Sequence, residues 1–287
     1  MTPHLLAIAS ALLYGSGDFL GGLSTRRAPM LLVVALGQAA GLGVLLGILA
    51  LMPPATATPA DLVWGAVAGV FGGAGVGLLY RALAVGTMSV VAPTTAVCAV
   101  AVPVLAGILM GEMPGSQVLT GIGLAAVSIV LVSQQPDAPT AGPSPSTRRL
   151  PQGLGTALGS GLLIGLFFLA LARTGPAAGL WPLLSARATS VAVFGAAMVV
   201  TGHTWRSGGT TAALIVAGGV LDMLANALYL LATHGGPLAS VVTLASLYPA
   251  STIVLARVVL GERIGYVQAA GIVVALIAVA LIVSAPA

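Results

Sequence analysis

Three ionisable residues, Asp18, Arg187 and Asp222, lie inside long apolar stretches of the chain. Where such a stretch crosses a bilayer, a charge at its centre costs about 2.5–3.5 kcal/mol on insertion scales, so these residues are candidates for function by default. Either aspartate could exchange a proton or bind a cation. Arg187 and Asp222 could instead form a structural ion pair, and the sequence leaves both interpretations open.

Polar and aromatic side chains recur at helical spacing around these three residues. In a helix, Asp222 shares one face with Asn226, Tyr229 and Thr233, and Tyr14 lies one turn before Asp18. An aromatic ring beside a carboxylate suits an amphipathic or cationic organic solute. The expected binding residues for a small molecule are Tyr14, Asp18, Gln38, Trp181, Arg187, Asp222, Asn226, Tyr229 and Tyr248.

The motifs of common enzyme and metal sites do not occur in the sequence. Neither His-Glu-x-x-His nor Gly-x-Ser-x-Gly is present, and the three histidines are far apart along the chain. The single cysteine, Cys98, excludes a disulfide framework or a Cys-rich metal centre. The basic residues are scattered, which argues against nucleic-acid binding despite a net charge of +4. We therefore expect a protein that is not an enzyme and needs no metal or cofactor.

The composition indicates which elements must position the candidate residues. The chain is 58% hydrophobic and only 6% charged, too few charges to cover a water-facing surface. A membrane-spanning helix needs about 20 consecutive apolar residues. Runs of about that length predict an all-α membrane protein with ten transmembrane helices, at Leu5–Leu23, Met30–Met52, Leu62–Leu83, Val90–Met110, Ser116–Ser133, Gly153–Arg173, Leu180–Thr201, Thr210–Ala232, Leu238–Leu260 and Gly265–Ser284.

Smaller signals refine this picture of packed spans. Glycines four residues apart allow close helix packing in lipid, and they occur at Gly65, Gly69, Gly73 and Gly77, and as the pairs Gly43/Gly47, Gly155/Gly159 and Gly161/Gly165. Aromatic residues near span ends are expected to anchor at the membrane interface, namely Trp64, Tyr80 and Trp205. Glu112 and Glu262 each follow a glycine at a predicted helix end, and we expect each to begin the next helix.

The chain resembles itself at an offset of about 150 residues, the signature of an internal repeat. Gly111-Glu112 matches Gly261-Glu262, and Gln38 falls at the position that matches Arg187. We expect a first five-helix repeat at 1–134, a linker at 135–151 and a second repeat at 152–287. An odd number of spans per repeat inverts the second copy in the membrane, an architecture typical of secondary transporters with a site near the midplane.

The same residues carry a resemblance to a known family. Tyr14 to Gly22, Tyr80-Arg81-Ala82-Leu83 with Gly86, the two Gly-Glu pairs and Tyr248-Pro249 resemble the EamA-like family of the drug/metabolite transporter superfamily, in its ten-helix form. The resemblance implies a multi-pass transporter of the plasma (inner) membrane that exports a small organic metabolite or drug, and it implies a functional arginine at Arg187. Proton coupling is one expectation for the aspartates. A facilitated uniporter or exchanger with structural aspartates, and a structural membrane protein without transport, are the alternatives.

Membrane orientation receives two opposing signals. Loops after odd-numbered spans carry Arg26, Arg27, Arg81, Arg148, Arg149, Arg206 and Arg263, whereas those after even-numbered spans carry Arg173. The positive-inside rule then places both termini outside. The family resemblance places both termini inside. No oligomeric state is predicted.

Overall fold

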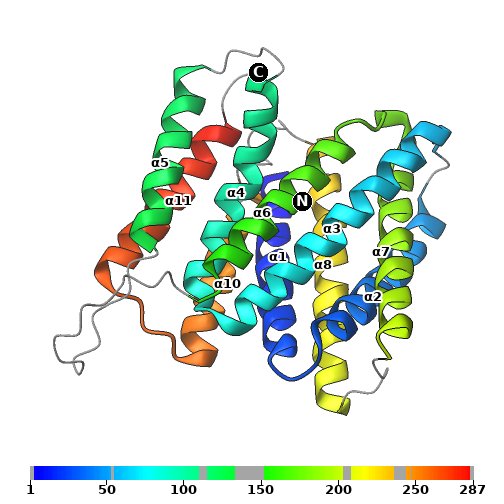
Figure 1. Ribbon diagram of the computed structural model, residues 1–287. Coiled ribbons are helices and arrows are strands. Elements are labelled where there is room, and N and C mark those ends of the chain that lie inside the picture. Colours follow the sequence, from blue (N-terminus) through cyan, green and yellow to red (C-terminus); the bar gives the residue numbers. More distant parts are fainter. Residues whose placement is uncertain are drawn as a thin grey trace.

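The computed structural model describes residues 3–52, 55–109, 115–132, 152–202, 208–235, 244–245 and 247–284. Within these ranges the chain is helical and contains no strand (Figure 1). The α-helices are α1 (Pro3–Thr25), α2 (Met30–Leu51), α3 (Pro59–Val85), α4 (Met88–Leu109), α5 (Ser116–Val132), α6 (Leu154–Leu171), α7 (Trp181–Val200), α8 (Gly209–Gly235), α10 (Tyr248–Leu260) and α11 (Tyr266–Val283). A short 3₁₀ turn, Pro176–Ala178, precedes α7.

The start of α3 shows how side chains satisfy the backbone N–H groups that are left free at a helix N-terminus. Pro59 opens α3, and the Thr58 hydroxyl accepts from the backbone N–H of Asp61 at 3.3 Å. The Asp61 carboxylate accepts in return from the Thr58 N–H at 2.8 Å, which completes a capping box. Its other oxygen accepts from the Gly175 N–H at 2.7 Å, so the start of α3 is fixed to the loop after α6.

Hydropathy agrees with a membrane location for most of these helices. Among the described residues, seven helices are long and apolar enough to span a bilayer: α1, α2, α3, α6, α7, α8 and α11. Three shorter apolar stretches lie at Met88–Pro103, Ser116–Leu131 and Tyr248–Leu260. The protein is thus an all-helical, multi-pass membrane protein.

The span predicted at Leu238–Leu260 is interrupted. Leu247 is a non-helical N-cap and α10 starts at Tyr248, with Pro249 in its first turn. Proline lacks a backbone N–H and is favoured in the first turn of a helix, where that N–H has no partner within the helix, so Pro249 suits a helix that begins here. Residues 238–243 and 246 of the predicted span lie outside the described residues.

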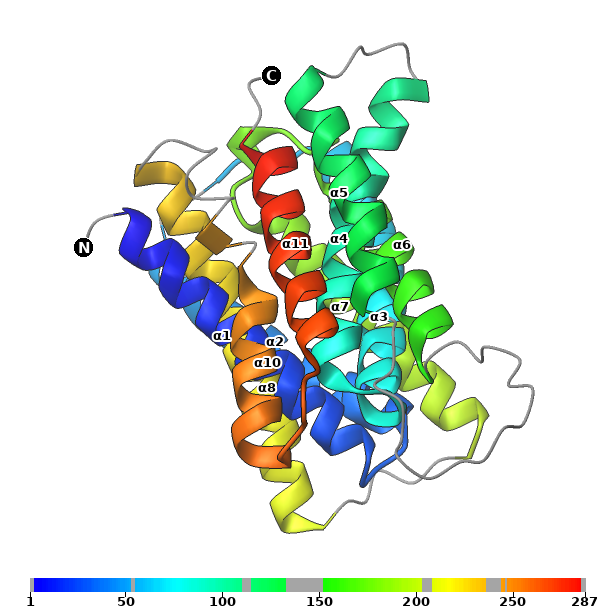
Figure 2. The ribbon, with the colours of Figure 1, turned by 90° about the vertical axis from the view of Figure 1, so that its left-hand side faces the viewer.

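Helix pairing recurs in the two halves of the chain. α1 packs along α8 in the same way that α6 packs along α3, and α5 pairs with α11 at one side of the bundle (Figure 2). Two hydrogen bonds repeat this pattern: Ser10 Oγ donates to the Ala225 carbonyl at 2.8 Å, and Ser160 Oγ donates to the Gly75 carbonyl at 2.8 Å. The donor Ser10 matches the donor Ser160, and the acceptor Ala225 matches the acceptor Gly75, each at the offset of about 150 residues found in the sequence.

Close glycine contacts follow the same offset. A Cβ added to Gly69 on α3 would lie 2.3 Å from the Ala186 carbonyl oxygen on α7, and one added to Gly219 on α8 would lie 2.1 Å from the Gly37 carbonyl oxygen on α2. Glycine is therefore needed for these helix backbones to approach. The predicted packing role of the glycines on α3 is confirmed, and the structure shows that the partner helix is α7. The predicted packing at Gly161 and Gly165 is also confirmed, because an added Cβ there would meet Cys98 and Val102 on α4.

Other small-residue and aromatic predictions are wrong. Gly43, Gly47 and Gly155 have no atom of the described residues within 4 Å of an added Cβ, so they do not pack against other helices in this part of the chain. Tyr80 is buried, and a Cβ at Gly21 would lie 2.2 Å from its ring, so it fills the core between α1 and α3 instead of anchoring at the interface. Trp205 lies outside the described residues.

Candidate functional site

A cavity of about 470 Å³ lies between the two halves of the chain. Its lining comes from α1 to α4 in the first half and from α6 to α8, α10 and α11 in the second, together with Ala245. On α4 the lining runs from Ala96 to Pro103, and on α11 it lies near the last turn, at Ile282 and Val283. The cavity therefore lies beside the middle of α4 and near the C-terminal end of α11.

Arg187, on α7, joins three helices at one wall of this cavity. Its Nη1 donates to Gln38 Oε1 on α2 at 2.6 Å, and its Nη2 forms an ion pair with Asp222 Oδ2 on α8. The guanidinium side chain is only 9% exposed, so neither charge is well solvated. Such a pair persists because each charge supplies the partner that the other has lost to desolvation. The ion pair that the sequence left as an alternative is present.

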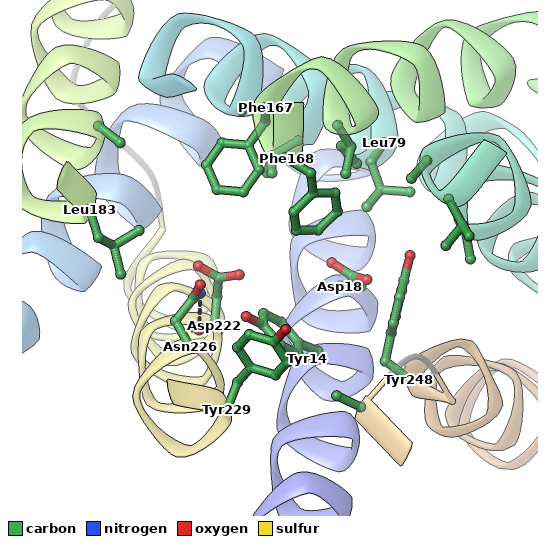
Figure 3. Close-up of a pocket in the computed structure, with 18 of the residues that line it drawn as sticks. Tyr14, Asp18, Leu79, Phe167, Phe168, Leu183, Asp222, Asn226, Tyr229 and Tyr248 are labelled. Carbon is green, nitrogen blue, oxygen red and sulfur yellow. Dashed lines mark hydrogen bonds between the residues drawn. The ribbon is translucent and has the colours of Figure 1, made fainter. Parts of the chain in front are cut away.

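Asp222 belongs to the polar face of α8 predicted from helical spacing. Asn226 Nδ2 donates to the Asp222 carbonyl at 2.8 Å, and Tyr229 extends the face toward the C-terminal end of the helix (Figure 3). The Thr233 side chain lies outside the described residues. The face of α8 that looks into the cavity is thus lined by a carboxylate, an amide and a phenol.

Asp18, on α1, faces the cavity in a different setting. Figure 3 shows its carboxylate between Tyr14 and Tyr248, whose ring centroids are 6.2 Å apart with the planes inclined at 60°. Asp18 forms no hydrogen bond or ion pair with any residue that the structure describes. With Arg187 paired to Asp222, the cavity carries one carboxylate that the described part of the chain does not compensate.

The wall across from Asp18 and Asp222 is apolar and was not predicted. Phe167 and Phe168 on α6 and Leu79 on α3 point into the cavity there (Figure 3). Phe168 stands at the repeat position of Asp18, and Leu79 stands at that of Tyr229. The repeat offset is the signal that could have found this wall, because each polar lining residue predicts a lining residue in the other half.

Eight of the nine predicted site residues are brought together, all of them lining the cavity: Tyr14, Asp18, Gln38, Arg187, Asp222, Asn226, Tyr229 and Tyr248. Trp181 is not among them. It is the first residue of α7 and is 39% exposed, whereas Leu183 and Ala186 present that helix to the cavity. A smaller groove on the outside of α3 and α6 holds Trp64, with the Arg173 guanidinium 6.0 Å from its ring centroid.

Glu262 has a partner that its sequence position does not suggest. It follows α10 in the chain, yet its Oε1 accepts from the Met88 N–H at 2.9 Å and its Oε2 from the Ser89 N–H at 3.1 Å and the Ser89 hydroxyl at 2.7 Å. The prediction that Glu262 begins the next helix is therefore wrong: it caps α4 in the other half of the chain. Glu112 lies outside the described residues.

Metal chemistry has no support among the described side chains, where no three His, Cys, Asp or Glu residues converge. The arrangement can instead hold a small molecule between a charged, hydrogen-bonding wall and an apolar one. Fold and cavity together define a helical membrane protein with a solute-sized site between two similar halves.

Comparison with known proteins agrees with this class. The sequence model of the EamA-like transporter family matches residues 1–134 and 151–284, and the chain belongs to that family of membrane transporters. Its fold is similar to one solved crystal structure at 16% sequence identity, with a TM-score of 0.62 over 97% of this chain and 95% of the other. The comparison with curated proteins gives no match.

Proposed function

We propose that the protein is a secondary transporter of the plasma membrane that moves a small organic solute by alternating access of two inverted five-helix repeats. The observation that carries the proposal is the cavity of about 470 Å³, built from both halves and lined by charges that are costly inside a membrane. Its volume falls within the range of small-molecule sites. Export is the direction that the family resemblance favours.

Inverted repeats account for the recurring contacts. Exchange of the halves converts the Ser10–Ala225 bond into the Ser160–Gly75 bond, and it converts the α1–α8 pair into the α6–α3 pair. Gln38 and Arg187 occupy matching positions and bond directly to each other. Two matching positions can touch only near the axis that relates the halves, so the Gln38–Arg187 contact marks this axis inside the cavity.

The two ends of the bundle differ in a way that suits alternating access. At the N-terminal end of α4, before the cavity lining begins at Ala96, Glu262 ties the second half to the first. In the mechanism we propose, a solute enters the site from the side away from this tie. Transport requires a second arrangement in which this tie opens and the other end closes.

The two aspartates take different roles in this scheme. Asp222 is held by Arg187 and positions the polar wall, while Asp18 is the carboxylate available to a proton or a cationic group. Proton coupling through Asp18 is one form of the mechanism, and facilitated exchange with solute alone on Asp18 is the other. In both forms the charge on Asp18 must be neutralised before the protein passes through a conformation in which the site is closed to water and the dielectric constant is low.

A cysteine-accessibility experiment tests alternating access without knowledge of the solute. Cys98 is the single cysteine in the chain, so Cys98→Ala provides a cysteine-free background for Val100→Cys, which lines the cavity on α4. A membrane-impermeant thiol reagent is applied to right-side-out and to inverted vesicles. Alternating access predicts modification of the Val100→Cys protein from both faces, at different rates.

A control variant makes the result specific to the cavity. Val193→Cys, on the outer face of α7, is 44% exposed but does not line the cavity, and the reagent should modify it from neither face. Modification of Val100→Cys from one face alone would contradict transport and favour a one-sided pocket in a structural membrane protein.

A further inference from the structure

Asp18 needs a partner that the described part of the chain does not supply. The guanidinium of Arg187 is occupied by Asp222 and Gln38, so it does not neutralise a second carboxylate. An ionised carboxylate away from bulk water is stable only when it is paired or hydrogen-bonded. The missing positive charge must therefore come from a proton or from a cation that enters the cavity.

The groups around Asp18 favour a cation with an organic surface. Figure 3 shows the rings of Tyr14 and Tyr248 on either side of the carboxylate, and the two ring centroids are 6.2 Å apart. An aromatic face attracts a cation that lies within about 6 Å of its centroid. Because Asp222 is paired with Arg187, Asp18 leaves the charged lining of the cavity with a net negative charge, which disfavours an anion. Aromatic rings bind a weakly hydrated ammonium group well, whereas a small metal ion prefers oxygen ligands.

The opposite wall selects the rest of the ligand. Phe167, Phe168 and Leu79 offer apolar surface and no side-chain hydrogen-bonding group. A hydrated inorganic ion gains nothing from this wall, but an aromatic or aliphatic body gains by leaving water. Phe168 matches Asp18 in the repeat, so the two walls have equivalent backbone positions, but one carries a charge and the other is apolar. A ligand with one charged end therefore has a single preferred orientation.

We propose that the cavity binds a monovalent, amphipathic organic cation, with its ammonium group at Asp18 beside Tyr14 and Tyr248 and its apolar body against Phe167 and Phe168. The inference rests on the proposed transport function and adds the chemical class of the solute. It also states which end of the solute each wall receives.

Matched probes test the charge and the apolar body separately. Phenyltrimethylammonium has the shape of the neutral molecule tert-butylbenzene, while tetramethylammonium has the same charge without the ring and benzenesulfonate has the opposite charge. Isothermal titration of the purified full-length protein should show phenyltrimethylammonium binding at least about tenfold more tightly than each of the other three. The neutral and anionic probes lose the charge pair with Asp18, and tetramethylammonium loses the burial of a phenyl ring.

Variants assign the charge preference to Asp18. Asp18→Asn should weaken phenyltrimethylammonium binding at least about tenfold, and Asp18→Glu should retain most of it, which shows that the site is folded. Asp61→Asn makes the same chemical change at a carboxylate that caps α3 outside the cavity, and it should leave the affinity unchanged. Phe168→Ala should weaken phenyltrimethylammonium but not tetramethylammonium.

Several results would overturn the inference. These are no binding of phenyltrimethylammonium at millimolar concentration, equal binding of the neutral or anionic probe, unchanged affinity in Asp18→Asn, or displacement by sodium at equal concentration. None of them affects the accessibility of Val100→Cys, which depends on the conformational cycle and not on the solute. Failure of the solute class is thus distinguishable from failure of the transport proposal.

Discussion

The contact between Glu262 and the start of α4 predicts a measurable shift in the conformational equilibrium. Three hydrogen bonds of 2.7–3.1 Å connect this carboxylate to Met88 and Ser89. Glu262→Gln retains one acceptor oxygen and turns an amide NH₂ toward a backbone donor, so at least one charge-assisted bond is lost. Hydrogen bonds to charged groups contribute about 1.5–3 kcal/mol, and the loss should be of this size.

If the contact between Glu262 and the start of α4 breaks during the transport cycle, the lost hydrogen bond destabilises only the conformation in which the contact is formed. A difference of about 1.5–3 kcal/mol then changes the ratio of the two conformations roughly 10- to 100-fold. With Cys98→Ala and Val100→Cys as the reporter, modification from the membrane face on the Glu262 side should become at least about tenfold faster. Modification from the other face should slow, because the state with the opposite opening becomes less populated.

A graded control separates gating from simple helix capping. Ser89→Ala removes the 2.7 Å hydroxyl bond but keeps the charged carboxylate and both backbone donors, so its effect should be at the low end of this range, about 1.5 kcal/mol or roughly tenfold in rate. If Glu262→Gln lowers the melting temperature while both modification rates stay unchanged, Glu262 is a permanent cap of α4 and the gating argument is refuted.

Two further predictions concern the ion pair and the helix packing. Arg187→Ala should destabilise the detergent-solubilised protein by about 3 kcal/mol, because it leaves Asp222 without its partner. Addition of Asp222→Asn should restore part of the melting temperature, and no recovery in the double variant would contradict the pairing. Gly69→Ala should lower the melting temperature because its Cβ meets the Ala186 carbonyl at 2.3 Å, whereas Gly43→Ala, with no neighbour within 4 Å, should leave it unchanged or slightly higher. Equal melting curves for the two glycine variants would argue against the close approach of α3 and α7.

Helix positions were largely predictable because the bilayer imposes a length and a polarity on each span. The boundaries of α2 and α11 agree with their predicted runs within a residue or two. The break at Leu247 was missed because apolar composition does not distinguish a continuous span from one interrupted at a proline. Tyr80 was misplaced for a related reason: an aromatic ring near a helix end is favourable both at the interface and in a glycine-lined core.

The polar half of the site was predictable because charges in apolar helices are rare. Asp222, Asn226 and Tyr229 follow from helical spacing alone, and the structure places all three along the cavity. Phe168 was missed because phenylalanine in a membrane helix gives no signal of its own, so its role emerges only from the repeat. Trp181 was included because it precedes Arg187, but it lies nearly two turns away at the exposed start of α7.

The direct bond between Gln38 and Arg187 bears on how such a chain can arise by duplication. In a symmetric dimer of two identical half-length chains, both residues at this position would be the same, and an arginine would meet a second arginine across the symmetry axis. The observed pair joins a cationic donor to a neutral acceptor, which identical subunits cannot provide. A contact of this kind therefore depends on two halves that differ in sequence, as they do in this single chain.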